Sequence, residues 1–384
     1  MEHKLRLHVI GIPHTKTNLD YVACAYTQKA YKFCKMMTER GHIVFHYGVE
    51  GSNPICTENI SVVSKEIYDE VYGNYDFRSK FFKCDFNDKC YQTFYTNAIK
   101  EIKARKDEYD IILPFWGEGV KPICDALQNE FIIIEPGIGY GEGAWSAYRV
   151  YESYSIFSAY CGTQSISYCN LTPNYHVIIP NYFDKNDFTF NGNARDRLIK
   201  EPYFLFIGRV YDGKGVHIAI QVCQALGVKL KIAGQLGEQY ENYNWPDNVE
   251  FIGYADRDTR NKLMQNAIAS FLPSQYLEPF GGVQIENLLC GTPTITSDWG
   301  AFAENNIEGV TGYRCRTFDD YLNAALNCLE GRIKYEDCYK QGLNFTLEAI
   351  APKYEKYFND VLNLYTGKGW YEVSPETQQR IANL

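Results

Sequence analysis

Two cations placed just after an apolar run are the first residues whose types and spacing could do chemistry. The segment Phe204–Gly215 has the sequence FLFIGRVYDGKG, in which Arg209 and Lys214 separate a predicted strand from a predicted helix. Two positive side chains, nearby backbone N–H groups and the first turn of a helix together suit the binding of a diphosphate. The alternative interpretation is an exposed arginine and lysine in an ordinary surface turn.

Two glutamates and two glycines follow a later apolar run. In the segment Ser274–Gly291 (SQYLEPFGGVQIENLLCG), Glu278 lies in a predicted loop and Glu286 lies about one turn into a predicted helix. Gly281 and Gly282 allow the backbone to approach an anion closely, and the helix that follows presents free N–H groups to it. The first glutamate could accept hydrogen bonds from sugar hydroxyls and the second from a ribose diol. Both could equally be solvated surface carboxylates.

Apolar runs alternate with longer amphipathic stretches along the first half of the chain. The runs are Leu5–Ile12, His42–Tyr47, Tyr109–Phe115, Phe131–Glu135 and Val177–Pro180. Because these runs are apolar throughout, they predict strands buried on both faces of a parallel sheet. The stretches Tyr21–Arg40 and Asn87–Lys106 predict helices, so the pattern is typical of βαβ units.

The same pattern restarts after a polar segment. The later runs are Tyr203–Val210, Val228–Ala233, Val249–Ile252, Ala267–Pro273 and Thr292–Thr296, followed by a helical pattern at Phe345–Leu364. We therefore expect two α/β domains, residues 1–184 and 203–350, joined by a linker at 185–202. Residues 351–384 are expected to form a helix and tail that cross back to the first domain. Ligands of open parallel sheets bind beyond the carboxyl ends of the strands, which predicts a cleft between the domains.

Composition argues against several other classes of protein. The formal net charge of −9 argues against non-specific nucleic-acid binding, and the 13 cysteines lack the spacing of a zinc site. No stretch of about 18 apolar residues is present, and the apolar run near the N-terminus is too short for a signal peptide. We expect a cytoplasmic protein with free thiols. The triplet Asp256-Arg257-Asp258 is interpreted as the N-cap region of a helix in preference to a metal site.

Taken in order, four motifs resemble those of the retaining GT-B glycosyltransferases typified by family 4. The residues that carry this resemblance are Gly208-Arg209 with Lys214-Gly215, Pro273-Ser274, Glu278-Pro279-Phe280-Gly281 with Glu286, and Gly291-Thr292-Pro293 with Gly300. Weaker matches extend the resemblance to about residues 175–360. It implies a GT-B fold, in which two Rossmann-like, doubly wound parallel-sheet domains face each other across a cleft.

The resemblance also implies a role for each motif of the second domain. Arg209 and Lys214 would hold the diphosphate of a nucleotide-sugar donor and stabilise the leaving phosphate, and Glu278 would orient the donor sugar. These three are the candidate catalytic residues. The rest of the donor would be bound by Glu286 at the ribose and by Gly208, Pro279, Phe280, Gly281 and Gly282. The cations would replace a metal ion, so neither a metal nor another cofactor is expected.

The first domain departs from the family pattern. A Gly-Gly loop commonly follows the first strand and a histidine commonly ends a later one, but this chain has Gly11-Ile12-Pro13-His14 and Glu135-Pro136-Gly137 at these places. The glycine-rich segment after Glu135 still indicates unusual backbone angles or the close approach of a ligand. As residues on the acceptor side we propose Glu135, Gly137 and Tyr140, with Glu118, His14 and His46 as weaker candidates.

The function implied is the retaining transfer of a hexose from a nucleotide diphosphate sugar, with UDP favoured, to an acceptor hydroxyl. A glycan, a lipid-linked sugar and a modified DNA base are all open as acceptors, and the composition is compatible with a viral protein in a host cytoplasm. The alternatives are a nucleotide-sugar epimerase on the same scaffold and an inactive descendant that only binds nucleotide. The lysines of Tyr21–Arg40 are interpreted as a solvated face in preference to a membrane or nucleic-acid contact.

Overall fold

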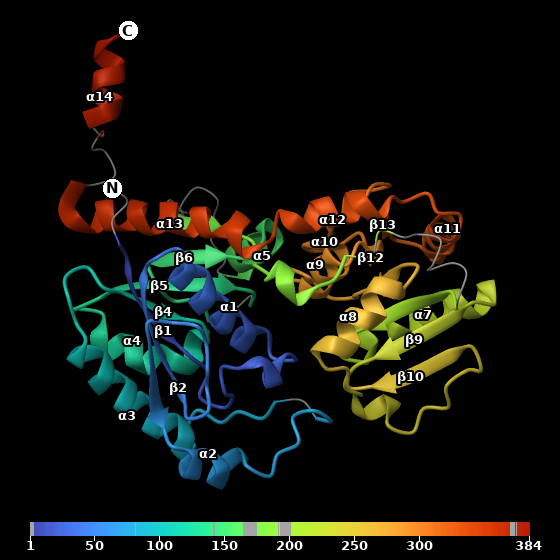
Figure 1. The fold of residues 1–384 in the computed structure, drawn as a ribbon, viewed down its shortest axis with the longest axis horizontal. Helices are drawn as coiled ribbons and strands as arrows, with labels where there is room; N and C mark the ends of the chain where they lie inside the picture. The colour runs from blue at the N-terminus through green and yellow to red at the C-terminus, as the bar shows by residue number, and fades with distance from the viewer. Residues whose placement is uncertain are drawn as a thin grey trace.

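Two parallel β-sheets, each covered by helices, form two domains that lie side by side (Figure 1). The computed structural model describes residues 4–80, 82–140, 143–163, 175–190, 192, 201–368, 373 and 375–384. Within these residues every pair of neighbouring strands is parallel. The predicted fold class, two doubly wound parallel-sheet domains, is therefore confirmed.

The first sheet has the strand order β3-β2-β1-β4-β5-β6-β7. Its strands are β1 (Arg6–Ile10), β2 (Ile43–Val49), β3 (Glu58–Val63), β4 (Ile111–Pro114), β5 (Ile132–Ile138), β6 (Tyr148–Tyr151) and β7 (His176–Ile178). The helices of this domain are α1 (Ala25–Glu39), α2 (Lys65–Tyr72), α3 (Lys89–Ala104), α4 (Lys121–Leu127) and α5 (Tyr154–Thr163). The order of the first six strands is that of a Rossmann sheet, in which the chain runs outward from β1 in both directions.

Both faces of the first sheet are buried. Val9 of β1 belongs to a core that includes α1, whereas the next residue, Ile10, belongs to a core that includes α3 and α4. Successive side chains of a strand point to opposite faces, so a strand covered on both sides must be apolar throughout. This is the reason that the continuous apolar runs of the sequence mark strands.

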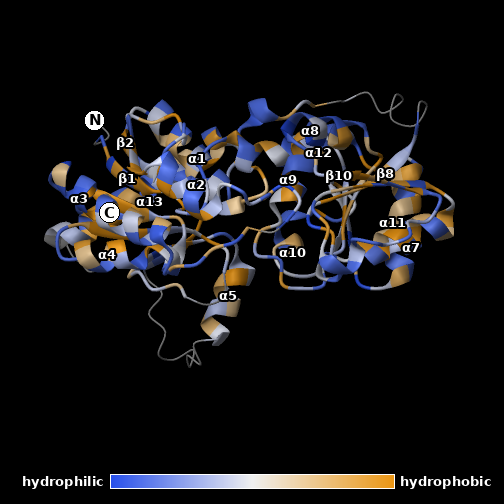
Figure 2. Cartoon of the chain, turned by 90° about the horizontal axis from the view of Figure 1, so that it is seen from below, coloured by the Kyte–Doolittle hydropathy of each residue, from blue (hydrophilic) through white to orange (hydrophobic). Residues whose placement is uncertain are grey.

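The second sheet repeats the same order, β10-β9-β8-β11-β12-β13. Its strands are β8 (Tyr203–Ile207), β9 (Lys229–Ala233), β10 (Val249–Gly253), β11 (Ser270–Leu272), β12 (Thr294–Ser297) and β13 (Gly312–Cys315). The helices are α7 (Val216–Leu226), α8 (Arg257–Asn266), α9 (Gly282–Leu289), α10 (Phe302–Asn305), α11 (Phe318–Leu329) and α12 (Tyr335–Leu343). Figure 2 shows largely hydrophobic strands between helices that carry both hydrophobic and hydrophilic residues.

Three strands were not predicted. β3 and β13 are edge strands; exposed residues such as Glu58 interrupt the apolar pattern of β3, and Arg314 interrupts that of β13. β6 has only four residues, and Arg149 lies in the middle of them. In each of these three strands a charged residue thus interrupts the continuous apolar run by which a buried strand is recognised.

A long C-terminal helix joins the two domains. α12 and α13 (Leu347–Asn363) follow each other along one side of the molecule, from the second domain to the first (Figure 1). At the crossing, the Phe183 N–H donates to the Phe345 carbonyl oxygen at 2.9 Å and the Leu347 N–H donates to the Phe183 carbonyl oxygen at 3.0 Å. Tyr354 and Phe358 are then buried in the first domain's core beside α1. The last helix, α14 (Pro375–Ala382), projects from the body and buries none of its residues.

The structure describes the predicted linker only in part. The predicted linker at 185–202 begins with a short 3-10 turn at Lys185–Asp187, and residues 191 and 193–200 lie outside the described residues. Twelve cysteines in the described ranges are free thiols. No helix within those ranges is long and apolar enough to cross a bilayer.

Candidate active site

A cleft of about 490 Å³ lies between the two domains. From the second domain it is lined by every residue for which the sequence predicts a donor-binding or catalytic role: Gly208, Arg209, Lys214, Glu278, Pro279, Phe280, Gly281, Gly282 and Glu286. These residues follow β8 and β11 or begin α9, so they come from the carboxyl ends of neighbouring parallel strands. That edge of an open α/β sheet is where ligands bind. The first domain contributes a second set that includes Tyr26, Lys29, Lys32, Gly139 and Glu152.

Lys214 and Glu278 form an ion pair in the cleft. The lysine Nζ donates to Glu278 Oε2 at 2.7 Å, and Ser274 Oγ donates to the same oxygen at 2.9 Å. The glutamate is largely buried, with 8% of its surface exposed. A buried carboxylate is costly unless it is paired and hydrogen-bonded, and here one cation and one hydroxyl meet that need. Two of the three candidate catalytic residues, 64 positions apart in the chain, are therefore direct neighbours.

The start of α9 faces the cleft with its free backbone N–H groups. Gly281 precedes this helix with φ +80°, and a Cβ there would lie 2.4 Å from the Phe302 ring. Glycine is thus required both by the left-handed backbone angle and by the close packing. Because Gly281, Gly282 and Val283 line the cleft, the positive end of the helix is available to an anion bound in it.

Glu286 has a partner that the sequence did not identify. It forms an ion pair with Arg260 of α8, and both residues line the cleft. Asp256 caps that helix by accepting a hydrogen bond from the Thr259 N–H at 2.9 Å, as interpreted from the sequence. Throughout the ranges that the structure describes, no group of three His, Cys, Asp or Glu side chains is arranged to hold a metal ion.

Of the prediction that Glu135 and the loop Gly137–Gly143 face the cleft, the part that concerns Glu135 is wrong. Glu135 is fully buried and accepts hydrogen bonds from the Tyr140 hydroxyl and from the N–H groups of Trp145 and Ser146. Burial raises the pKa of this carboxyl. Neither Glu135 nor Gly137 nor Tyr140 lines the cleft, whereas Gly139 does. The glutamate instead fastens the connection between β5 and β6, in which residues 141 and 142 lie outside the described residues.

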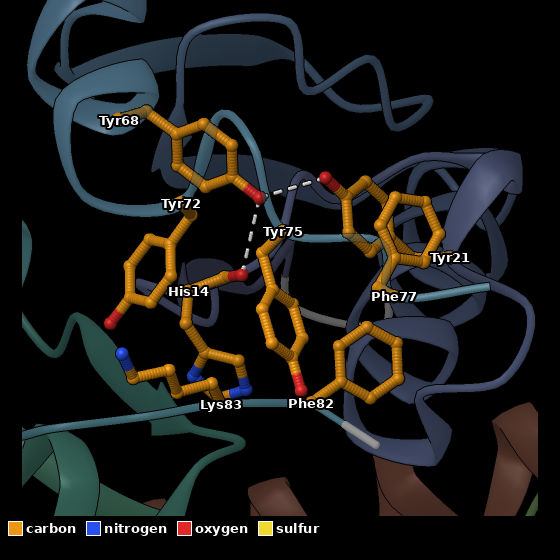
Figure 3. Close-up of a pocket in the computed structure, with 8 residues that line it drawn as sticks. All are labelled: His14, Tyr21, Tyr68, Tyr72, Tyr75, Phe77, Phe82 and Lys83. Carbon is orange, nitrogen blue, oxygen red and sulfur yellow. Dashed lines mark hydrogen bonds between the residues drawn. The ribbon is translucent and has the colours of Figure 1, made fainter. Parts of the chain in front are cut away.

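The weaker acceptor-side candidates also lie outside the cleft. Figure 3 shows His14 among tyrosine and phenylalanine rings, in a pocket of about 10 Å³ that has room for a single water. Its Nδ1 lies 2.7 Å from the Tyr91 hydroxyl oxygen, and burial lowers the pKa of His14 to about 4. His46 is fully buried between Asn59 and Thr17. Glu118 is exposed in a 3-10 turn at Gly117–Val120 and does not line the cleft.

The basic residues of α1 are not a solvated face, contrary to the interpretation of the sequence. Lys29 is buried and paired with Glu152, and Lys32 lies over the Phe183 ring at the cleft. Lys35 pairs with Asp184, and Arg40 pairs with Glu355 of α13. Lys29 and Lys32 therefore lie at the cleft, Lys35 lies at the end of the first domain, and Arg40 lies against α13. Glu152 was missed because it follows β6, the short strand that the apolar pattern did not mark.

Direct contacts hold the two domains together beside the cleft. Ser153 Oγ donates to the Pro279 carbonyl oxygen at 2.6 Å. The Glu304 carboxylate of α10 accepts from the Tyr154 N–H at 3.0 Å and from the Ser155 N–H at 2.7 Å, at the start of α5. Gln235 Nε2 donates to the Lys80 carbonyl oxygen at 3.2 Å. Segments that line the two walls are thus hydrogen-bonded to each other.

Comparisons with known proteins agree with this geometry. Residues 191–345 match the family model of the glycosyl transferases group 1. Glycogen synthase of Mycobacterium tuberculosis is 36% identical over 126 residues, which is 30% of this chain and 30% of that protein. The uncharacterized glycosyltransferase MJ1607 of Methanocaldococcus jannaschii is 28% identical over 179 residues, 41% of this chain and 43% of that protein. The chain thus matches less than half the length of these curated relatives.

Solved structures extend the likeness of fold to nearly the whole chain. AviGT4, a glycosyltransferase involved in avilamycin A biosynthesis, has a TM-score of 0.65 at 20% identity and covers 93% of this chain and 98% of its own. Sucrose-phosphate synthase from Thermosynechococcus elongatus has a TM-score of 0.66 at 18% identity, over 94% and 99% of the two chains. The fold is that of the GT-B glycosyltransferases. Within it, Arg209, Lys214, Glu278 and Glu286 lie in the segment that matches the family model of the glycosyl transferases group 1.

Proposed function

We propose that this protein transfers a hexose from a nucleotide diphosphate sugar to an acceptor hydroxyl, with retention of the anomeric configuration. The observation that carries the proposal is that all the predicted donor-binding residues line one interdomain cleft, in which Lys214 and Glu278 are paired. UDP is the first nucleotide to test, because the similar fold of Anabaena HepE has been determined with UDP-glucose. The acceptor is a glycan, a lipid-linked sugar or a modified DNA base.

The cations of the second domain would stabilise the leaving group. Arg209, Lys214 and the start of α9 would surround the diphosphate, where negative charge develops as the glycosidic bond breaks. Glu278 would accept hydrogen bonds from the donor sugar, and Glu286 would accept them from the ribose. With these fixed positive groups in the cleft, the reaction would need no metal ion.

The pairing of the carboxylates supports a retaining reaction in which the leaving phosphate itself takes the proton. Four carboxylates are described along the cleft, and each is paired with a cation: Glu152 with Lys29, Asp187 with Arg257, Glu278 with Lys214, and Glu286 with Arg260. The acceptor oxygen would attack the anomeric carbon on the face from which the diphosphate leaves. Its proton would pass to the departing phosphate oxygen, so no protein base would be required.

A binding and hydrolysis screen tests the proposed function. The purified protein would be melted in EDTA with UDP-, GDP-, ADP- and dTDP-glucose in turn, and free nucleoside diphosphate would be measured after incubation. We expect one sugar nucleotide to raise the melting temperature and to release its nucleoside diphosphate slowly to water. Isomerised sugar nucleotide without release would indicate an epimerase, and no stabilisation by any of the four would contradict donor binding.

A further inference from the structure

The wall of the cleft formed by the first domain contains a buried ion pair. Lys29 of α1 and Glu152, which follows β6, are in direct contact and are exposed to only 9% and 4%. The lysine Nζ also donates to the Gly137 carbonyl oxygen at 2.9 Å and lies 4.6 Å from the centre of the Tyr26 ring. Both charged residues line the cleft. Three elements of the first domain, α1, β5 and the end of β6, therefore meet at this ion pair.

The glycine-rich segment after β5 provides the space that the pair occupies. A Cβ at Gly139 would lie 2.8 Å from Glu152 Oε1 and 2.9 Å from Oε2. Carbon atoms essentially never approach carboxylate oxygens so closely, so a larger residue at this position would displace the glutamate. The signal that indicated a ligand-binding loop in the sequence is thus explained by the close approach of Glu152.

Glu152 lies next to the loop that is expected to hold the donor sugar. The adjacent residue, Ser153, donates its hydroxyl hydrogen to the carbonyl oxygen of Pro279, which directly follows Glu278. Within the described residues, Lys29 Nζ is the hydrogen-bond partner of the Glu152 carboxylate, through Oε1. Among the same residues, the second oxygen, Oε2, accepts no hydrogen bond, and Glu152 lines the cleft.

A buried ion pair such as this one is in general a weak source of stability. The cost of removing two charges from water offsets much of their attraction, and neutral replacements of similar volume are often as stable. Because the pair has no net charge, the surface immediately around Glu152 suits a neutral hydroxyl group better than a phosphate. The other cation of this wall, Lys32, lies over the Phe183 ring.

We propose that Glu152 binds the acceptor, through a hydroxyl that neighbours the attacking one, and that the acceptor is therefore a neutral sugar or polyol. This proposal rests on the proposed transferase function. As the bond from the anomeric carbon to the phosphate oxygen breaks, the attacking oxygen forms the new bond and its proton passes to the phosphate. Glu152 exchanges no proton and only orients the acceptor, and Lys29 is a positioning residue that holds the carboxylate.

The test compares the rates at which three forms of the protein transfer the sugar to water, to a methyl glycoside and to DNA. Wild type, Glu152→Gln and the double variant Lys29→Met with Glu152→Gln would be given the sugar nucleotide that the screen identifies. The acceptors are water alone, methyl α-D-glucopyranoside, methyl α-D-mannopyranoside and a DNA duplex that contains 5-hydroxymethylcytosine. We expect wild type to glycosylate a methyl glycoside, and Glu152→Gln to lower kcat/KM for that acceptor about tenfold or more. Transfer to the glycoside should fall by a larger factor than hydrolysis by water, because only transfer uses this hydroxyl contact, and the Kd for the nucleoside diphosphate should change less than about twofold.

The double variant distinguishes a binding role from a structural one. Glu152→Gln alone leaves Lys29 as a buried cation without its partner, which lowers the melting temperature. If the pair only maintained the fold, neutralising both residues would return both the melting temperature and the transfer activity to the wild-type values. We expect it to restore the melting temperature and leave transfer to the glycoside impaired.

Three results would overturn the proposal while leaving the transferase intact. These are unchanged transfer to the glycoside in Glu152→Gln, a parallel loss of hydrolysis, and a wild type that hydrolyses the donor but transfers to the duplex alone or to no probe. A wild type that releases no nucleotide from any donor would instead refute the proposed function, and this inference would fail with it.

Discussion

The two walls of the cleft are built from the chain in different ways. On the wall of the second domain, Arg209 and Lys214 follow one strand within a few residues, and the loop from Glu278 leads directly into the helix that contains Glu286. On the opposite wall, Lys29 and Glu152 are 123 residues apart and come from a helix and a strand end. The wall of the second domain, which is predicted to bind the donor (the donor wall), is therefore a set of local motifs. The wall of the first domain, which is proposed to bind the acceptor (the acceptor wall), exists only after that domain has folded.

Removal of the paired side chains on the donor wall is expected to have the largest effect. Lys214→Ala and Glu278→Ala should each lower turnover by about 10²–10³-fold, because the first removes a cation from the leaving phosphate and the second a contact to the donor sugar. The measurement is the rate of nucleoside diphosphate release at saturating donor.

The control for this prediction is Lys340→Ala. That lysine is exposed on α12, away from the cleft, and pairs only weakly with Asp337. Turnover should be unchanged in the control, and the melting temperatures of all three variants show whether the fold is retained. Wild-type turnover in either test variant would remove that residue from the active site.

Within the donor wall, a change at Glu286 is expected to weaken binding more than chemistry. Glu286→Gln removes the charged acceptor predicted for the ribose diol and leaves Arg260 without its ion-pair partner. The Kd for the nucleoside diphosphate should rise about tenfold, which is typical for the loss of a hydrogen bond to a charged group. Calorimetric titration measures this change. A large fall in kcat at unchanged Kd would contradict the assignment of Glu286 to the nucleotide.

The difference between the walls also explains which site residues could be predicted from the sequence and which could not. The apolar runs marked β1, β2, β4, β5, β8, β9, β11 and β12, which are buried on both faces, and also the edge strands β7 and β10. The donor residues could be named because local motifs position them at the ends of those strands. Glu152 could not be named, because β6 is short and was not recognised. Glu135 was chosen for its place at a strand end, but its side chain turns into the domain to hold the loop.

Acid is expected to loosen the first domain before the second. Burial lowers the pKa of His14 and of His46 to about 4, and both lie in the first domain. Between about pH 6.5 and pH 4 the unfolded chain binds protons that the folded histidines do not, so the free energy of unfolding falls as the pH is lowered. Hydrogen exchange at pH 7 and pH 5 should show a greater loss of protection, after correction for intrinsic rates, in β1 and β2 than in β8 and β9. Equal losses in both sheets would contradict this expectation.

The smallest expected effect concerns the contact that joins the two walls. Ser153 is buried, and its hydroxyl donates to the Pro279 carbonyl oxygen while it accepts from the Ile156 N–H at the start of α5. Ser153→Ala should lower the free energy of unfolding by about 1–2 kcal/mol, because it removes one hydrogen bond between the domains and one helix cap. Denaturant titration measures this change, with Ser153→Thr as the control that keeps the hydroxyl. The Kd for the nucleoside diphosphate should remain within about twofold of wild type, since each wall holds its own residues in place. A larger loss of nucleotide affinity would show that the donor wall depends on the acceptor wall for its geometry.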